Sequence, residues 1–435
     1  MIDRRALRTG CAVGLRQISG GLATLTLAVL ARKVAPMEER FTGSFTQQEP
    51  IPEAGIEAAN QVMRHGRLHR YNVVEGEVSQ TALLEEEFAG AMGAKFCLAV
   101  ASGGYAIATA LRAMGVGPGD KVLTNAFTLA PVPGAIASLG AVPVFVEVTE
   151  DLVIDLEDLA QKIAAGQGEV LLLSHMRGHI CDMDGLMAIC DGAGVRVIED
   201  CAHTMGARWN GVLSGRHGAM AAYSTQTYKH MNSGEGGLLI SDDPTLMARA
   251  IILSGSYMLY DRHRAAPPPG AFEDVKYVTP NISGRMDNLR AAILRPQLAG
   301  LDARCAAWNE RYRVVEKGLG DTPGLTLISR PEAEEFVASS FQFLLAGWGE
   351  DDIAQVVARC ADRGVELKWF GGAEPVGFTS RYDSWRYAQT PVLARTDHVL
   401  KSVLDMRLPL TFSLQDCALI ARIIRAEVSR VFQAG

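Results

Sequence analysis

The hydrophobic positions after residue 95 follow two different periods. Short, nearly continuous apolar runs are separated by stretches such as 105–114, in which apolar residues recur every three or four positions. The first pattern predicts buried β-strands and the second predicts amphipathic helices. The expected strands are 95–102, 121–127, 142–148, 169–175, 195–201, 221–226 and 236–243. Apolar strands that alternate with helices are typical of an α/β protein with a mostly parallel sheet covered on both faces.

A further region begins near residue 286. Apolar residues keep a helical spacing from Met286 to about Lys317, which predicts one long connecting helix. Beyond it, short apolar runs and helical stretches alternate up to a final helix over 414–432, which predicts a smaller α/β layer. We therefore expect a large domain over 37–300 and a small C-terminal domain over 301–435.

The first 36 residues form an N-terminal extension of different composition. Arg4, Arg5 and Arg8 precede an apolar stretch, 18–31, that Ser, Gly and Thr interrupt. This stretch is too short and too diluted to predict a stable membrane span, although it resembles the core of a weak signal peptide. The alternative is a start codon placed too early, because Met37 opens the domain pattern.

Charge and cysteine content narrow the partners and the compartment. The 435 residues include 42 Lys or Arg and 49 Asp or Glu, which gives a formal net charge of −7. This mildly acidic balance argues against nucleic acid as a partner. Eight cysteines are scattered along the chain without a C-x-x-C pair. We therefore expect reduced core thiols in a cytoplasmic protein, and no metal site.

Three segments at the ends of predicted strands carry candidate chemistry. Ser102, Gly103 and Gly104 form a turn between a strand and a helix, which suits a phosphate, although such a turn is commonly only structural. Asp200 ends an apolar strand, where α/β proteins place ligand-contacting groups, although it could cap the next helix. Lys229 precedes a glycine cluster, where burial would lower its pKa and make its amine a nucleophile. The alternative for Lys229 is a surface position.

Together these segments supply what pyridoxal 5′-phosphate (PLP) requires. The turn would hold the phosphate, the carboxylate would keep the pyridine nitrogen protonated, and the lysine amine would bond to the cofactor's carbonyl carbon. No Walker A motif, paired-histidine zinc motif or G-x-S-x-G elbow competes with this hypothesis.

The order of the motifs resembles the DegT/DnrJ/EryC1/StrS aminotransferase family. The resemblance runs from about residue 41 to about residue 315 and includes SGGYA, GPGDKVLTNAFT, SHMRGHICDMD, VIEDCAHTMGA, STQTYKHMNSGEGG and RMDNLRAAILRPQL. It implies a fold-type I PLP enzyme and a homodimer with shared active sites. It also implies amino sugar biosynthesis or related chemistry, in which glutamate or glutamine donates an amino group to a keto-sugar, keto-cyclitol or related carbonyl by a ping-pong mechanism.

The resemblance assigns roles to single residues. Lys229 corresponds to the lysine that bonds to the cofactor, Asp200 to the partner of the pyridinium nitrogen, and His203 to a residue that reaches the cofactor ring. The phosphate would be held by Ser102, Gly103, Gly104 and Ser224.

The chain departs from the family pattern at three places near this site. Gly104 stands where threonine is usual, so a hydroxyl contact is lost and the backbone N–H remains. Leu129 stands where an aromatic ring usually stacks on the cofactor, so the packing there is aliphatic or comes from elsewhere. Ser283, Gly284 and Arg285 replace the usual Asn-Tyr-Arg, so the asparagine that reaches the partner's phosphate is missing. These changes suggest an outlying branch whose substrate need not be a nucleotide sugar.

Other nearby residues keep two interpretations each. Gln226, in the Ser-x-Gln pattern before the lysine, is similar to the residue found in the aminocyclitol and aminoshikimate-type branch of the family. The alternative is that it is a polar residue that fills the turn. Arg70, Tyr71, Arg177 and His179 would line the substrate entrance, or they are ordinary surface groups.

Two other functions stay open at this stage. A PLP-dependent sugar dehydratase or other lyase is the first, although such relatives carry histidine in place of Lys229; the neighbouring His230 is noted for this reason. The second is a non-catalytic PLP-binding protein, for which the chain offers no helix-turn-helix pattern or basic stretch.

Overall fold

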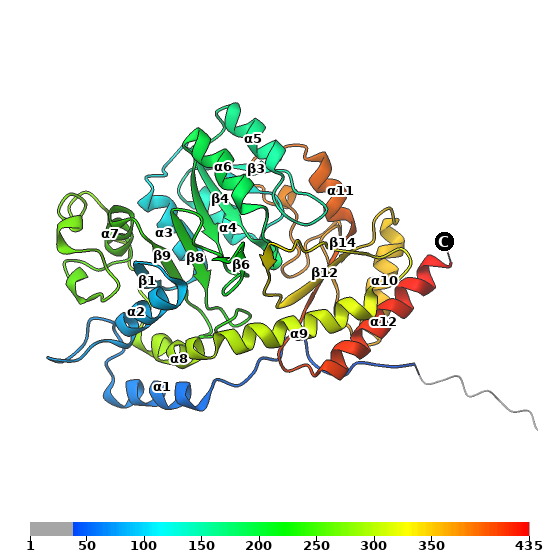
Figure 1. The fold of residues 1–435 in the computed structure, drawn as a ribbon, viewed down its shortest axis with the longest axis horizontal. Helices are drawn as coiled ribbons and strands as arrows, with labels where there is room; N and C mark the ends of the chain where they lie inside the picture. The colour runs from blue at the N-terminus through cyan, green and yellow to red at the C-terminus, as the bar shows by residue number, and fades with distance from the viewer. Residues whose placement is uncertain (1–37, 435) are drawn as a thin grey trace, which may run out of the picture. The chain divides into compact units, whose positions relative to one another are not determined.

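A seven-stranded sheet forms the centre of the computed structural model, which describes residues 38–434 (Figure 1). The predicted extension over 1–36 lies outside the described residues. The strand order is β1-β9-β8-β5-β4-β2-β3. The strands are β1 Phe96–Val100, β2 Lys121–Asn125, β3 Val142–Val146, β4 Val170–Ser174, β5 Arg196–Asp200, β8 Met220–Ser224 and β9 Gly237–Ser241. Only β9 pairs antiparallel with its neighbours in this sheet, so the predicted mostly parallel sheet is confirmed.

Helices cover both faces of this sheet. In β1, Cys97 and Ala99 belong to one buried cluster, and Leu98 and Val100 belong to another, because alternate residues of a strand face opposite sides. One face packs against α3 Gly103–Ala113, α4 Pro131–Ser138 and α7 Pro244–Leu253. The other face packs against α2 Gln80–Met92, α5 Leu156–Ala164, α6 Met183–Ala193 and α8 Asn288–Ala299, while α1 Glu53–His65 lies on α8.

Polar N-caps determine where these helices begin. Each cap residue accepts a hydrogen bond from a backbone N–H of the first turn, which satisfies a donor that the helix itself leaves unpaired. The caps of α2, α3, α5, α6, α7 and α8 are Ser79, Ser102, Asp155, Asp182, Asp243 and Asp287.

A second, antiparallel sheet lies in the C-terminal part of the chain. Its order is β10-β12-β14-β13, and its strands are Thr326–Leu327, Ser340–Leu344, Val403–Arg407 and Lys368–Trp369 in that order. It packs with α9 Leu301–Leu319, α10 Glu350–Asp362 and α12 Leu414–Phe432, and α12 has the predicted bounds. Phe41 and Phe45 also pack in this core, against Phe412. The contacts group 39–435 into one compact unit, so the division at residue 300 stays a prediction.

The remaining elements are short, apart from the helix α11 Ala394–Ser402. A small sheet of order β11-β6-β7 joins Glu334–Glu335, Arg208–Trp209 and Val212–Leu213. The 3₁₀ helices are η1 Met176–Gly178, η2 Tyr260–Arg262, η3 Pro269–Phe272 and η4 Tyr382–Ser384. None of the helices within 38–434 has the length and hydropathy needed to span a bilayer.

The prediction of one long helix from Met286 to about Lys317 is wrong, because the structure has two helices there, α8 and α9. The chain before α8 is extended, because the backbone N–H of Ala101 donates to Gly284 O (2.8 Å) and that of Met286 donates to Ala99 O (3.3 Å). Asp287 then caps α8. The helix stops at Ala299, and Gly300 separates it from α9. Glycine is a weak helix former, so an interruption there is physically reasonable.

Candidate active site

The eight predicted site residues all line one cavity of about 480 Å³ at the carboxyl ends of the parallel strands. They are Ser102, Gly103, Gly104, Leu129, Asp200, His203, Ser224 and Lys229. Asp200 ends β5 and Ser224 ends β8, while Ser102 follows β1. Parallel strands bring their carboxyl ends to one edge of a sheet, which is where open α/β sheets bind ligands.

The turn after β1 has the properties of a phosphate cradle. Ser102 is the N-cap of α3, and its Oγ accepts a hydrogen bond from the Tyr105 N–H (3.1 Å). Gly103 and Gly104 are the first helical residues, so their N–H groups are available to an anion at the positive end of the helix dipole. A Cβ on Gly103 would lie 2.8 Å from Ser224 Cβ. Glycine thus lets the turn approach the Ser224 hydroxyl, and the residues present fit a phosphate group.

Alanine at Gly103 should therefore disturb the cradle. The new Cβ would overpack the contact with Ser224, at a cost of about 1–3 kcal/mol. We expect the dissociation constant of PLP to rise about 10-fold or more, as measured by fluorescence titration. Gly117→Ala is a suitable control, because a Cβ there meets nothing within 4 Å. Equal PLP affinity of Gly103→Ala and the wild type would contradict this role.

The Asp200 carboxylate is held in a fixed orientation at the end of β5. Its Oδ2 accepts a hydrogen bond from the Ser174 hydroxyl (3.2 Å), and its Oδ1 accepts one from the Ala202 N–H (3.1 Å). The Thr128 hydroxyl donates to Ser174 Oγ (2.8 Å), which restricts that side chain in turn. Burial raises the pKa of Asp200, while the positive charge of Lys229 opposes this rise.

Lys229 lies in the loop between β8 and β9, with its side chain in the cavity. Its backbone N–H closes a turn on Gln226 O (2.9 Å). Burial lowers the pKa of the Lys229 amine to about 7, and the positive charges of Arg177 and Arg407 also lower it. The negative charge of Asp200 acts in the opposite direction and raises this pKa. A large fraction of the amine is therefore neutral near pH 7, which makes it a nucleophile and a base.

His203 supports this state of the lysine. Its Nε2 lies 3.0 Å from Lys229 Nζ. Burial and the Lys229 charge hold the pKa of His203 well below its usual range, so the imidazole is neutral. The two nitrogens can thus share a hydrogen bond without a second buried positive charge.

The lowered pKa gives a direct prediction for chemical labelling. In protein stripped of cofactor, acetylation of Lys229 should follow a titration with a midpoint of about 7. At pH 8 its neutral fraction would exceed that of a lysine with an ordinary pKa about 300-fold. Peptide mass spectrometry measures the rate, with the exposed Lys317 as an internal reference. A midpoint above about 9 would show that the amine is not desolvated.

The structure shows which of the residues with two possible roles line the cavity. Arg177 lines the cavity. Gln226 does so as well, while its Oε1 fills the turn by accepting a hydrogen bond from the Tyr228 N–H (2.9 Å). His179 is buried, bonded to Gln342 (2.9 Å), and is not among the cavity-lining residues.

Arg70 and Tyr71 fit neither of their two interpretations. Both are buried, and neither lines the cavity. Arg70 forms a two-pronged ion pair with Glu85 at 2.8 Å, and Tyr71 Oη bonds to His263 Nε2 (2.7 Å). Glu85 also accepts the Ala99 N–H (2.8 Å), so this network anchors β1 behind the site.

Several cavity residues come from distant segments and were not predicted from the sequence. The most important is Arg407, which ends β14 and lines the cavity with Phe378 and Tyr228. The position of Arg407 at the end of the short, mostly apolar run 403–406 was a usable signal for this residue. The sequence does not show, however, that β14 ends at the same cavity as β5.

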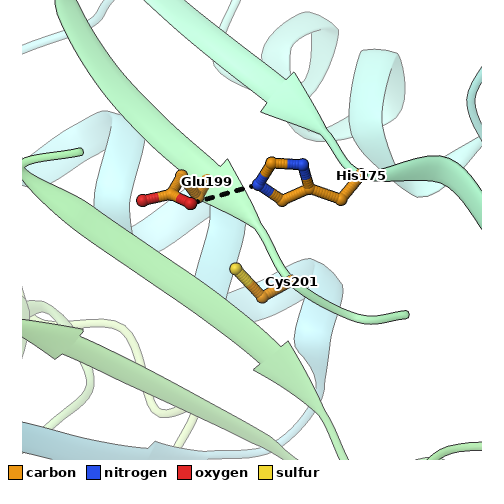
Figure 2. A group of neighbouring side chains, drawn as sticks. All are labelled: His175, Glu199 and Cys201. Carbon is orange, nitrogen blue, oxygen red and sulfur yellow. Dashed lines mark hydrogen bonds and ion pairs between the residues drawn. The ribbon is translucent and has the colours of Figure 1, made fainter. Parts of the chain in front are cut away.

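A buried group beside the site, drawn in Figure 2, offers three metal-ligand types: His175, Glu199 and Cys201. The Glu199 carboxylate is already used, because it bonds to His175 Nε2 (3.1 Å) and accepts the N–H groups of Gly215, His217 and Gly218 at 2.7–2.9 Å. Burial raises the pKa of the Cys201 thiol well above its usual value, which disfavours the thiolate that metals bind. We interpret this group as a hydrogen-bonded anchor for the loop after β7.

Comparisons with known proteins agree with this geometry. The sequence profile of the DegT/DnrJ/EryC1/StrS aminotransferase family matches residues 51–425. The chain is 35% identical over 249 residues to 3-amino-5-hydroxybenzoate synthase of Amycolatopsis mediterranei, covering 55% of this chain and 60% of that one. It is 32% identical over 256 residues to dTDP-3-amino-3,4,6-trideoxy-alpha-D-glucose transaminase of Streptomyces venezuelae, covering 58% and 63%. The alignments thus span less than two thirds of these two relatives.

A solved structure extends the likeness over more of the fold. The crystal structure of 3-amino-5-hydroxybenzoic acid synthase superposes with a TM-score of 0.75 and 26% identity, covering 90% of this chain and all of that chain (100%). The predicted fold class is thereby confirmed. Since the family profile matches most of its length, the chain belongs to the DegT/DnrJ/EryC1/StrS aminotransferase family.

Proposed function

We propose that this protein is a PLP-dependent aminotransferase that moves an amino group from glutamate or glutamine to a keto-sugar, keto-cyclitol or related carbonyl. The observation that carries the proposal is the Lys229 amine, whose pKa is about 7, in the same cavity as the Asp200 carboxylate and an open helix N-terminus. PLP is the cofactor of this family, in agreement with the sequence prediction. When bound, it supplies a carbonyl for amine exchange and a ring that accepts electrons.

Each polar group of the cavity then has a separate task. The N–H groups of Gly103 and Gly104 and the Ser224 hydroxyl would hold the phosphate. Asp200 would keep a proton on the ring nitrogen, because its orientation is fixed by Ser174 and Ala202. Lys229 Nζ would remove a proton from the substrate carbon that bears the amino group. It would then deliver this proton to the carbon of the cofactor that carries the carbonyl group.

The lining of the cavity would keep water from the reacting atoms. Leu129 lines the cavity as an aliphatic contact, and Phe378 and Trp308 add aromatic surface. A largely apolar lining strengthens the electrostatic effect of Asp200 on a bound ring.

The dehydratase or lyase alternative finds less support in the structure. His230, the neighbour of the lysine, is buried with its ring 5.1 Å from that of Trp308, and it does not line the cavity. Burial lowers its pKa to about 3. His230 is therefore poorly placed to replace Lys229 in proton transfer.

The test of the function is the visible spectrum of the purified protein before and after excess glutamate or glutamine. We expect a yellow band from lysine-bound PLP that bleaches toward the near-ultraviolet as the donor loses its amino group. Addition of a keto acceptor should then restore the yellow band. Over the full reaction, one molecule of donor should be consumed for each amine product formed. Product without stoichiometric loss of the donor would favour the lyase. A colourless protein that cannot be reconstituted with PLP would refute the proposal.

We also propose that the enzyme is a cytoplasmic homodimer with shared active sites. The described cysteines are all free and buried, which suits a reducing compartment. The loop before α8 exposes Tyr277 (80%) and Val278 (75%), and exposed apolar side chains are candidates for a subunit contact. Light scattering should give twice the chain mass, whereas a monomer with full activity would contradict shared sites.

A further inference from the structure

The cavity wall formed by η1 and the C-terminal sheet contains more positive than negative charge. Arg177, in η1, and Arg407, at the end of β14, both line the cavity. Lys368, in the adjacent strand β13, pairs in register with Asp405 of β14. Asp405, which is fully buried, lies beside Arg177 and attracts Lys368, and the exposed Glu366 also attracts Lys368.

The hydrogen bonds leave this charge unbalanced. Arg177 Nη2 lies 2.7 Å from Asp405 Oδ2, and Asp405 Oδ1 already accepts a bond from Gln342 Nε2 (2.7 Å). Lys368 Nζ is buried without a hydrogen-bond partner, as is Nε of Arg177. The Arg407 guanidinium makes no hydrogen bond or ion pair with any residue of 38–434 and instead contacts the rings of Tyr228 and Phe378. Among the described residues, one buried carboxylate, Asp405, thus lies beside Arg177 and Lys368, and no carboxylate forms an ion pair with Arg407.

Aromatic rings hold Arg407 in place. Its guanidinium carbon lies 3.6 Å from the centre of the Tyr228 ring and 5.1 Å from that of Phe378. Lys368 Nζ lies 4.8 Å from the same Phe378 ring. Stacking fixes the plane of a guanidinium while leaving its N–H edge free to donate. Arg407 is thus preorganised for a planar acceptor in the cavity.

Arg177 is held in an unusual backbone conformation. Its φ is 57°, in the left-handed region that residues other than glycine rarely adopt, and its side chain is only 6% exposed. Strain of this kind tends to persist where the geometry serves a function. The charges of Arg177 and Arg407 both lower the pKa of Lys229 and of Lys368, which places the two arginines near both amines.

We propose that Arg177 and Arg407, backed by Lys368, bind a carboxylate group of the substrate. The proposal rests on the proposed function, because it assigns this carboxylate to a molecule that reacts at Lys229. A guanidinium fork matches a carboxylate in a planar, two-pronged arrangement, and a buried excess of positive charge is stabilised by an anion. Arg177 and Arg407 line the same cavity as Lys229 and lower the pKa of its amine, so a carboxylate bound there lies near the reacting carbon. The diphosphate of a nucleotide sugar lies beyond the sugar ring and fits this position poorly.

The carboxylate could belong to the amino donor or to the acceptor, and two pairs of probes separate these sources. Glutarate and its uncharged diamide represent the donor, while cyclohexanecarboxylate and its amide represent a six-membered acceptor. Binding to the holoenzyme is measured by calorimetry. We expect at least one carboxylate to bind about 10-fold or more tighter than its amide. Preference for glutarate alone assigns the site to the donor, and preference for the cyclic acid assigns it to the acceptor.

Variants show whether the preference comes from these arginines. Arg407→Gln should remove it, Arg407→Lys should restore part of it, and Arg425→Gln, an exposed arginine on α12, should leave it unchanged. The visible cofactor band confirms that each variant is folded and loaded. If Arg407→Gln does not hold the cofactor, the test uses Arg407→Lys alone, because that variant keeps the positive charge and removes the planar guanidinium. A reduced preference for the carboxylate over its amide in Arg407→Lys would then support the proposal.

Two results would overturn the proposal: no preference for either carboxylate in the wild type, or an undiminished preference in both Arg407 variants. Failure of the proposed function gives a different result. In that case the carboxylate preference would still depend on Arg407, but donors would not bleach the cofactor band.

Discussion

Replacing Lys229 by alanine will lower kcat by at least about 10⁴-fold while the protein remains folded. Lys229 is the only lysine among the cavity-lining residues within 38–434, so no other lysine is placed to supply its amine. The amine is needed twice, once to hold the cofactor and once to move the proton. Its removal also deletes a buried amine whose charged form the site disfavours, so we expect little loss of thermal stability.

The measurement is donor consumption under saturating substrates, together with the visible spectrum. Lys317→Ala, which removes an exposed lysine on α9, is the matched control and should behave as the wild type. Partial recovery of the Lys229→Ala variant by a small added amine would support the role in proton transfer. Appreciable turnover without such an amine would show that Lys229 is not the reacting group.

The sequence predicted this part of the site because the positions involved follow from local pattern. Asp200 and Ser224 end apolar strands, and Ser102 follows one, so a parallel sheet brings them to one edge whatever the details of packing. Lys229 was assigned through its glycine-rich loop and the family resemblance. The structure adds the reason for its reactivity, since burial and the two arginines both act on its pKa.

Other features depend on contacts between distant segments and could not be predicted in this way. Arg70 appeared as a surface or entrance residue, but its partners Glu85 and His263 lie 15 and 193 positions away in the chain. Burial of a charge depends on such partners, and a single sequence does not show them. Arg407 reaches the site only because β14 pairs with β12 and β13 in a separate sheet. Local pattern predicted the strand-end groups, whereas long-range pairing determines the charged wall.

Replacing Asp200 by asparagine will lower kcat by about 10³-fold, through loss of charge rather than of shape. The two side chains have nearly the same volume. The Ala202 N–H can still donate to the amide oxygen, while the amide nitrogen can donate to Ser174 Oγ in place of the bond that the Ser174 hydroxyl gave. The asparagine cannot stabilise a proton on the ring nitrogen, so the bound ring would accept electrons poorly. The exposed Asp191→Asn on α6 is the matched control.

A second measurement on the same variant separates this role from a merely structural one. The negative charge of Asp200 raises the pKa of Lys229, against the effects of burial and of the arginines. Its removal should therefore move the midpoint for acetylation of Lys229 in cofactor-free protein below about 7. A low kcat with this acid shift places Asp200 in the electrostatics of the site. A low kcat with an unchanged midpoint would mean that the substitution displaced the loop that carries Lys229, and a kcat within about 3-fold of the wild type would remove Asp200 from the mechanism.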